Sequence, residues 1–133
     1  MSATPKHHNP GFLALVEDAK ARIRHIDIDE YKRLLESGEA GVLIDTREES
    51  EWSAGHAQGA IHLGKGIIER DIEAIVPDKE QRLVLYCGGG YRSALAADAL
   101  RKMGYKDAIS LDGGWRAWTQ AGMPVGSPET STR

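Results

Sequence analysis

Apolar and polar positions follow two different periods along this chain. Short apolar runs bounded by polar residues or glycine predict buried strands, and such runs occupy residues 24–26, 41–45, 60–63, 83–86 and 108–111. Between them, apolar residues recur at helical spacing, which predicts helices over residues 10–24, 28–36, 67–75, 93–103 and 115–121, with a shorter one around 48–54. Strands that alternate with helices indicate an α/β fold, with a mainly parallel sheet covered by helices on both faces.

Capping residues support two of the predicted helix starts. Asp27 and Glu30 have the spacing of a capping box, and Gly38 marks the end of the helix that they begin. Asn9, followed by a proline, is suited to cap the first helix. The apolar face of that first helix includes Phe12 and its neighbours, and it either covers the sheet domain or pairs two subunits.

The chain length of 133 residues fits one domain with a substantial core. We expect this domain over residues 25–125. Residues 1–24 are expected to form an N-terminal tail and a helical extension. Residues 126–133 are rich in Ser, Thr and Pro, and we expect them to be a disordered tail.

Charge and composition exclude several classes of protein. The net charge of −3 gives no general attraction to nucleic acid or to anionic membranes. No apolar run is long enough to span a bilayer, and the N-terminus lacks the apolar core of a signal peptide. One cysteine forms no internal disulfide, so nothing indicates a secreted scaffold. We therefore expect a cytoplasmic protein, either monomeric or homodimeric.

The only cysteine of the chain, Cys87, stands where the predicted strand 83–86 ends. The residues that join it to the next helix are Gly88, Gly89, Gly90, Tyr91, Arg92 and Ser93. Backbone N–H groups at a helix N-terminus and a nearby arginine both favour a thiolate, and consecutive glycines let the backbone turn its N–H groups inward. Ser93 is placed either to cap the helix or to donate a hydrogen bond to the sulfur. This arrangement predicts a catalytic nucleophile rather than a packing cysteine.

Three segments, in this order, resemble the single-domain rhodanese-like sulfurtransferases. Residues 87–93 are similar to the family's Cys-x-x-Gly-x-Arg-Ser active-site loop. Residues 45–62 resemble its upstream block, and residues 111–125 its C-terminal signature. The resemblance covers roughly residues 25–125 and implies a rhodanese fold with a five-stranded sheet, to which the N-terminal helix is an addition.

The resemblance also implies a reaction. The Cys87 thiolate attacks a sulfane sulfur donor such as thiosulfate, releases sulfite and holds the sulfur as a persulfide, which cyanide or a thiol then removes. The inward N–H groups of residues 88–92 stabilise charge on the persulfide. No metal or organic cofactor is needed. Because the chain has no second cysteine, the acceptor comes from outside it, and a persulfide on another protein is a further candidate donor.

Three charged residues belong to this hypothesis. Arg92 is expected to bind the anionic substrate. Arg47 follows the strand that ends at Asp45. We expect it to contact the anionic substrate, to form an ion pair that orients the loop, or to make a surface salt bridge with a neighbouring glutamate. Asp45 is expected to support the loop by accepting hydrogen bonds or by pairing with an arginine.

Two other functions remain as alternatives. Rhodanese-like domains also serve as binding or regulatory modules, or as sulfur carriers without turnover of small molecules, although such members often lack the cysteine. A phosphatase is less favoured, because four residues separate Cys87 from Arg92 and related phosphatases have one more. His56 and His62 are expected to organise the loop and the sheet through hydrogen bonds.

Overall fold

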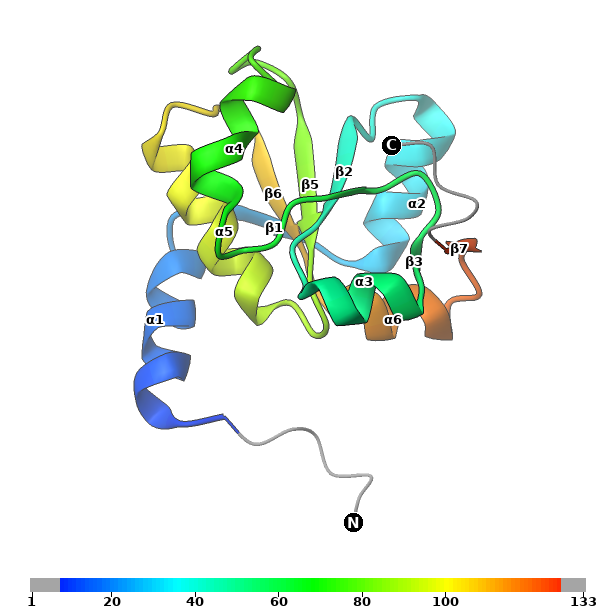
Figure 1. The fold of residues 1–133 in the computed structure, drawn as a ribbon, viewed down its shortest axis with the longest axis horizontal. Coiled ribbons are helices and arrows are strands. Elements are labelled where there is room, and N and C mark those ends of the chain that lie inside the picture. Colours follow the sequence, from blue (N-terminus) through cyan, green and yellow to red (C-terminus); the bar gives the residue numbers. More distant parts are fainter. Residues whose placement is uncertain (1–7, 128–133) are drawn as a thin grey trace.

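The computed structural model describes residues 8–127, and its centre is a five-stranded parallel sheet between two layers of helices (Figure 1). Its strands, in the order in which they lie side by side, are β1 (Arg24–Ile26), β6 (Ala108–Leu111), β5 (Leu83–Tyr86), β2 (Val42–Asp45) and β4 (Ile61–His62). All four strand pairings are parallel. The predicted α/β fold class is therefore confirmed.

A second, two-stranded antiparallel sheet joins β3 (His56–Ala57) to β7 (Val125–Gly126). Neither strand was predicted, because a strand of two residues leaves no recognisable pattern. Gly126 thus belongs to a strand and extends the fold one residue beyond the predicted end of the domain. Residues 128–133 of the predicted disordered tail lie outside the described residues.

The described residues form six helices, and each predicted helix is present. They are α1 (Pro10–Lys20), α2 (Ile28–Ser37), α3 (Glu49–Ala54), α4 (Ile68–Ile75), α5 (Tyr91–Lys102) and α6 (Gly114–Gln120). The capping box of Asp27 and Glu30 is present, and Gly38 ends α2 in the left-handed conformation. By contrast, Asn9 makes no side-chain capping bond to α1.

The two faces of the sheet form two separate apolar cores, because side chains alternate along each strand. On β5, Val84 and Tyr86 pack in the core that contains Trp118 of α6, whereas Leu83 and Leu85 pack in the core with α4 and α5. Figure 1 shows α4 and α5 on one side of the sheet and α2 and α6 on the other. Both faces of β5 are thus buried.

Helix α1 packs along α5, at the edge of the layer that α5 forms (Figure 1). Val16 and Ala19 are each 1% exposed in this contact. Arg22, just after the helix, donates to both carboxylate oxygens of Asp98 on α5, at 3.1 and 2.7 Å, and this hydrogen bonding lowers the pKa of Asp98 to about 2. The helix is therefore fastened to the domain by apolar contact and by an ion pair.

No helix within residues 8–127 is long and apolar enough to cross a membrane.

Candidate active site

The thiol of Cys87 lies in a cradle of backbone amides where β5 ends. Its Sγ accepts a hydrogen bond from the N–H of Gly90 at 3.1 Å and another from the N–H of Ser93 at 3.4 Å. Gly90 has a φ of 103°, which favours glycine, and a Cβ there would lie 3.2 Å from the backbone nitrogen of Gly113. The amides of residues 88–92 were predicted to face inward, and that of Gly90 donates to the sulfur. The second donor, the N–H of Ser93, lies one residue beyond the predicted range.

Of the two roles predicted for Ser93, it donates a hydrogen bond to the sulfur, through its backbone N–H, and it does not cap the helix. Helix α5 begins at Tyr91, after Gly90 as its N-cap, so Ser93 stands inside the first turn and does not cap the helix. Its Oγ lies 3.6 Å from Sγ of Cys87, in a contact in which the thiol is the donor. The same oxygen is 2.8 Å from Oγ of the buried Ser110 on β6. Ser110, which sequence reasoning missed, therefore helps to orient the hydroxyl next to the sulfur.

Arg92 lies beside the cradle, where a carboxylate holds its guanidinium. Its two terminal nitrogens donate to Glu51 of α3, at 3.0 and 3.2 Å. The hydrogen bonding between Arg92 and Glu51 lowers the pKa of Glu51. The same interaction raises the pKa of Arg92. A substrate anion must therefore compete with Glu51, or share the arginine with it.

Arg47 lies in a buried cluster at the ends of β2 and β5. Its guanidinium donates to the carboxylate of Asp45 at 2.8 to 3.1 Å and to the carbonyl oxygen of Gly55 at 2.7 Å. Tyr86 donates its hydroxyl to the same carboxylate at 2.6 Å and accepts the N–H of Ala57 at 2.9 Å. Asp45 therefore supports the end of β5 through Tyr86, the residue that precedes the nucleophile.

This position decides between two of the alternatives for Arg47, because its ionic partner is the buried carboxylate of Asp45 and not a surface glutamate. The residue is 3% exposed, so it forms no surface salt bridge, and it is not among the residues that line the pocket. Burial works to lower the pKa of Arg47, but the hydrogen bonds and charge of Asp45 outweigh it and raise that pKa. The guanidinium lies 4.6 Å from the centre of the Trp115 ring. In this geometry Arg47 links the end of β2 to the loop at Gly55.

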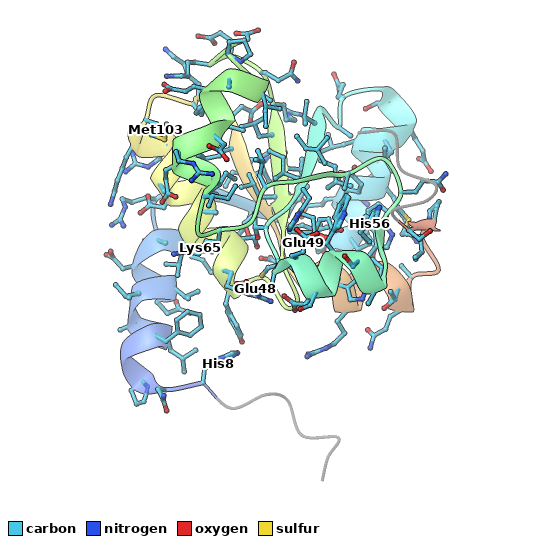
Figure 2. All side chains as sticks on the ribbon, in the orientation of Figure 1. His8, Glu48, Glu49, His56, Lys65 and Met103 are labelled. Carbon is cyan, nitrogen blue, oxygen red and sulfur yellow. The ribbon has the colours of Figure 1, made fainter. Side chains whose placement is uncertain are left out.

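His56 and His62 make the hydrogen bonds that the sequence predicted for them. A ring nitrogen of His56 lies 3.0 Å from the carbonyl oxygen of Trp52, and one of His62 lies 2.7 Å from that of Arg47. Trp52 stacks on both imidazole rings. Figure 2 shows His56 inside the fold, beside the small sheet. Neither histidine lines the pocket at Cys87.

The start of α6 supports the cysteine loop from the other side. The N–H of Trp115 donates to the carbonyl oxygen of Cys87 at 2.7 Å, and the N–H of Arg116 donates to that of Gly88 at 3.2 Å. Gly114 precedes them with a φ of 47°, and a Cβ at this position would overlap the carbonyl oxygen of Cys87. The close approach of the two segments therefore requires glycine.

We expect Gly114→Ala to destabilise the protein by about 2 kcal/mol more than Gly122→Ala, which is the matched control. Both glycines have a positive φ, so both variants carry the conformational cost of about 1 kcal/mol. Nothing lies within 4 Å of a Cβ at Gly122, whereas at Gly114 the loop of Cys87 must move. Urea unfolding of the two variants measures the difference, and equal losses of stability would show that the close approach is unimportant.

A pocket of about 840 Å³ opens over the sulfur. Its lining comes from α1 and the residues before it, α3, the cysteine loop and α6: His8, Phe12, Glu51, Cys87, Gly88, Gly89, Tyr91, Arg92, Trp115, Arg116 and Thr119. Cys87 lines the pocket although it is only 1% exposed. Among residues 8–127, no group of three or more histidine, cysteine, aspartate or glutamate side chains is arranged to hold a metal ion. The chemistry that this site offers is that of a cradled thiol with a cation beside it.

Sequence reasoning missed several residues of this pocket. Glu51, Arg116 and Thr119 belong to no motif around the cysteine. They reach the pocket because Glu51 of α3 pairs with Arg92 and because α6 begins against the loop. His8 and Phe12 come from the N-terminal extension. Phe12 was predicted to lie on the apolar face of the first helix. Such a position indicates packing against the domain and does not indicate that the side chain lines a pocket.

The comparison with protein families gives one match, to the rhodanese-like domain, over residues 27–121. Over 95 residues the chain is 37% identical to a probable adenylyltransferase/sulfurtransferase, MoeZ, of Mycobacterium tuberculosis. That stretch is 71% of this chain, and it spans only 24% of the relative's length. The chain is also 30% identical to the thiosulfate sulfurtransferase GlpE of Vibrio cholerae over 101 residues, which are 76% of this chain and 92% of that protein.

Solved structures show the same fold. A protein of unknown function from Rhodopseudomonas palustris, described as a possible tyrosine phosphatase, superposes with a TM-score of 0.80 at 30% identity. The match covers 92% of this chain and 99% of that one. The polysulfide-sulfur transferase homodimer of Wolinella succinogenes superposes with a TM-score of 0.74 at 27% identity, over 92% of each chain. In both cases the matched portion is too large for the family core alone, so it includes part of the N-terminal extension.

Proposed function

Because this chain belongs to the rhodanese-like domain family, we propose that it is a sulfurtransferase that carries sulfane sulfur on Cys87. The observation that carries the proposal is the cradle, in which two backbone N–H groups point at a sulfur that lines an open pocket with Arg92. Such donors stabilise negative charge on a thiolate and on the persulfide that replaces it. The relationship to sulfurtransferases, GlpE among them, supports the same chemistry.

The proposed reaction has two half-reactions. The Cys87 thiolate attacks the outer sulfur of thiosulfate, an S–S bond forms at the enzyme as the donor's S–S bond breaks, and sulfite leaves with the electron pair. A thiophilic acceptor, cyanide or a thiol, then attacks the outer sulfur of the persulfide and regenerates the Cys87 thiolate. No electron is gained or lost overall, and the covalent intermediate divides one transfer into two steps.

Several features support the remaining parts of the proposal. Cys87 is the only cysteine of the 133 residues, so the acceptor thiol comes from outside them. The side chains at the sulfur supply hydrogen bonds and charge, and we propose that no metal or organic cofactor takes part. A free nucleophilic thiol is suited to a reducing compartment, and we therefore propose a cytoplasmic location.

A phosphatase activity is less well supported. The loop between Cys87 and Arg92 contains four residues, and the amides of Gly90 and Ser93 converge on the sulfur itself. A phosphatase needs donors that converge on the oxygens of a phosphoryl group held above the sulfur. The geometry of this loop therefore favours a single added sulfur atom over a tetrahedral phosphate.

Steady-state kinetics with thiosulfate and cyanide test the proposal. We expect thiocyanate to form, and double-reciprocal plots at several fixed cyanide concentrations to be parallel, because sulfite leaves before cyanide binds. Polysulfide is the second donor to be used, and p-nitrophenyl phosphate reports phosphatase activity. Hydrolysis of the phosphate ester without sulfur transfer from either donor would overturn the proposal.

A further inference from the structure

Ser110 is a buried polar residue in a strand that is otherwise apolar. It lies on β6, beside β5 (Figure 1), and its backbone pairs with that of Leu85. The residues before and after it on the strand face the core that contains Trp118, so Ser110 faces the other side of the sheet, where α5 lies. Because the side chain is completely buried, its hydroxyl costs free energy unless it forms a hydrogen bond.

Two contacts join Ser110 to the nucleophile. Its Oγ is 2.8 Å from Oγ of Ser93, and that oxygen is 3.6 Å from Sγ of Cys87. Within residues 8–127 the hydroxyl of Ser110 forms no hydrogen bond other than the one with Ser93, and the hydroxyl of Ser93 forms none beyond these two contacts. The three side chains therefore form a short chain with the sulfur at one end, and none of the three residues is more than 1% exposed.

The number of protons gives this chain a direction. If Ser93 donated to Ser110, the proton of Ser110 would have no acceptor among the described residues, and a buried donor without a partner is costly. Ser110 therefore donates to Ser93, and the proton of Ser93 is left for its other neighbour, Sγ of Cys87. A protonated thiol competes for this contact as a donor. A thiolate accepts only, so the direction of the chain favours the ionised sulfur.

We infer that Ser110 is a positioning residue for sulfur transfer: by donating to Ser93, it holds the Ser93 proton toward Sγ of Cys87 and stabilises the thiolate there. A hydroxyl that itself accepts a hydrogen bond is the stronger donor, so Ser110 acts on the sulfur without touching it. The inference rests on the proposed function, in which the thiolate is needed twice. It attacks the donor, and it is the leaving group when the acceptor takes the outer sulfur, since the S–S bond then breaks and Sγ keeps the electron pair.

Charged groups also act on the sulfur, and the variants that test the inference leave all of them in place. The charge of Arg92 acts on Cys87 directly. The titratable and charged side chains that line the pocket, or that pair beside the cysteine loop, come from α1 and the residues before it, α3, α5, α6 and the ends of β1, β2 and β6. They are His8, Lys20, His25, Asp45, Arg47, Glu51, Tyr91, Arg92, Asp112 and Arg116. A change in the reactivity of the sulfur in these variants therefore comes from the hydroxyls.

The pH profile of alkylation tests the inference. Cys87 is the only cysteine of the chain, so the gain in mass with iodoacetamide reports on its thiolate alone. We expect Ser110→Ala to move the profile to higher pH, with alkylation about threefold slower on its rising part. Thr46→Val is the matched control, because Thr46 is also buried and its hydroxyl donates to the carbonyl oxygen of Tyr86. That oxygen keeps the backbone N–H of Thr46 as a donor, so this variant should keep the native profile.

A double variant separates an effect that passes through Ser93 from a general loss of packing. Ser93→Ala removes the hydroxyl through which Ser110 acts and keeps the backbone N–H that donates to the sulfur. We therefore expect Ser110→Ala to have no further effect on the profile in the Ser93→Ala protein. Equal shifts in both backgrounds, or a native profile for Ser110→Ala alone, would overturn the inference. Urea unfolding, measured alongside, establishes that each variant is folded under the conditions of alkylation.

Discharge of the persulfide connects the hydroxyl chain to sulfur transfer. Protein loaded by thiosulfate or polysulfide is mixed with cyanide, and the rate of thiocyanate formation measures the step in which the Cys87 thiolate leaves. We expect Ser110→Ala to slow this step about threefold and Thr46→Val to leave it unchanged. If Cys87 is loaded but Ser110→Ala discharges at the native rate, the inference is wrong and the proposed function stands. If no donor loads Cys87, the proposed function fails and the inference fails with it, whatever the alkylation profiles.

Discussion

Replacing Cys87 with serine is expected to abolish sulfur transfer, with a loss of at least about a thousandfold, while the fold remains intact. The side chain is buried, and the N–H groups of Gly90 and Ser93 that now donate to sulfur have an oxygen to donate to in the variant. A serine hydroxyl is not ionised near neutral pH. The partners of the sulfur are two backbone amides and a hydroxyl, and none of them is a base that would take its proton.

Two measurements on Cys87→Ser check this result. Thiocyanate formation with thiosulfate and cyanide reports activity, and urea unfolding reports stability, which we expect to change by less than about 1 kcal/mol. Turnover within tenfold of the native rate would remove Cys87 from the mechanism. A large loss of stability would mean that the loss of activity reports misfolding, and Cys87→Ala then serves as the second variant.

The second large effect is expected at Arg47, on stability. Replacing Arg47 with methionine removes the cation from the carboxylate of Asp45, which is completely buried. A buried charge left without its partner costs about 3 to 5 kcal/mol, so we expect the variant to lose stability by that amount. Chemical unfolding measures the loss, and a change below about 1 kcal/mol would show that the pair contributes little.

A double variant separates the ion pair from simple packing. In Arg47→Met with Asp45→Asn, no buried charge is left uncompensated, so we expect part of the lost stability to return. The hydroxyl of Tyr86 still has an acceptor in the asparagine oxygen. Loading of Cys87 by thiosulfate, measured well below the unfolding midpoint, should continue in both variants, because Arg47 does not line the pocket. Specific loss of loading with an unchanged fold would indicate the substrate contact that was one of the alternatives for Arg47.

The sheet was predictable because its strands are short apolar runs at regular intervals. The run at 83–86 is buried on both faces, so it has no competing amphipathic pattern, and its end at Cys87 follows directly. The first two residues of α5 were not predictable in the same way. Tyr91 and Arg92 follow three glycines, and the N-cap residue, Gly90, has no side chain that could mark the helix start in the sequence. The start at Tyr91 is visible only in the folded structure.

The site was predictable only where it is local in the sequence. Cys87, the glycines and Arg92 form one continuous motif, so their proximity needed no knowledge of the fold. Glu51 and Arg116 are brought to the loop by helices from different parts of the chain, and no spacing in the sequence encodes that contact. The burial of Arg47 was not predictable for a related reason, since it depends on Gly55 and Trp115, which approach it only in the folded chain.

The central claim is that Cys87 holds a sulfur atom as a covalent intermediate, and intact mass spectrometry after incubation with a sulfane donor tests it most directly. The native protein should gain the mass of one sulfur atom with thiosulfate, polysulfide or an organic persulfide, and cyanide should reverse the gain. The Cys87→Ser variant should gain nothing under the same conditions. A native protein that gains no mass with any of these donors, or an equal gain on the serine variant, would contradict the account.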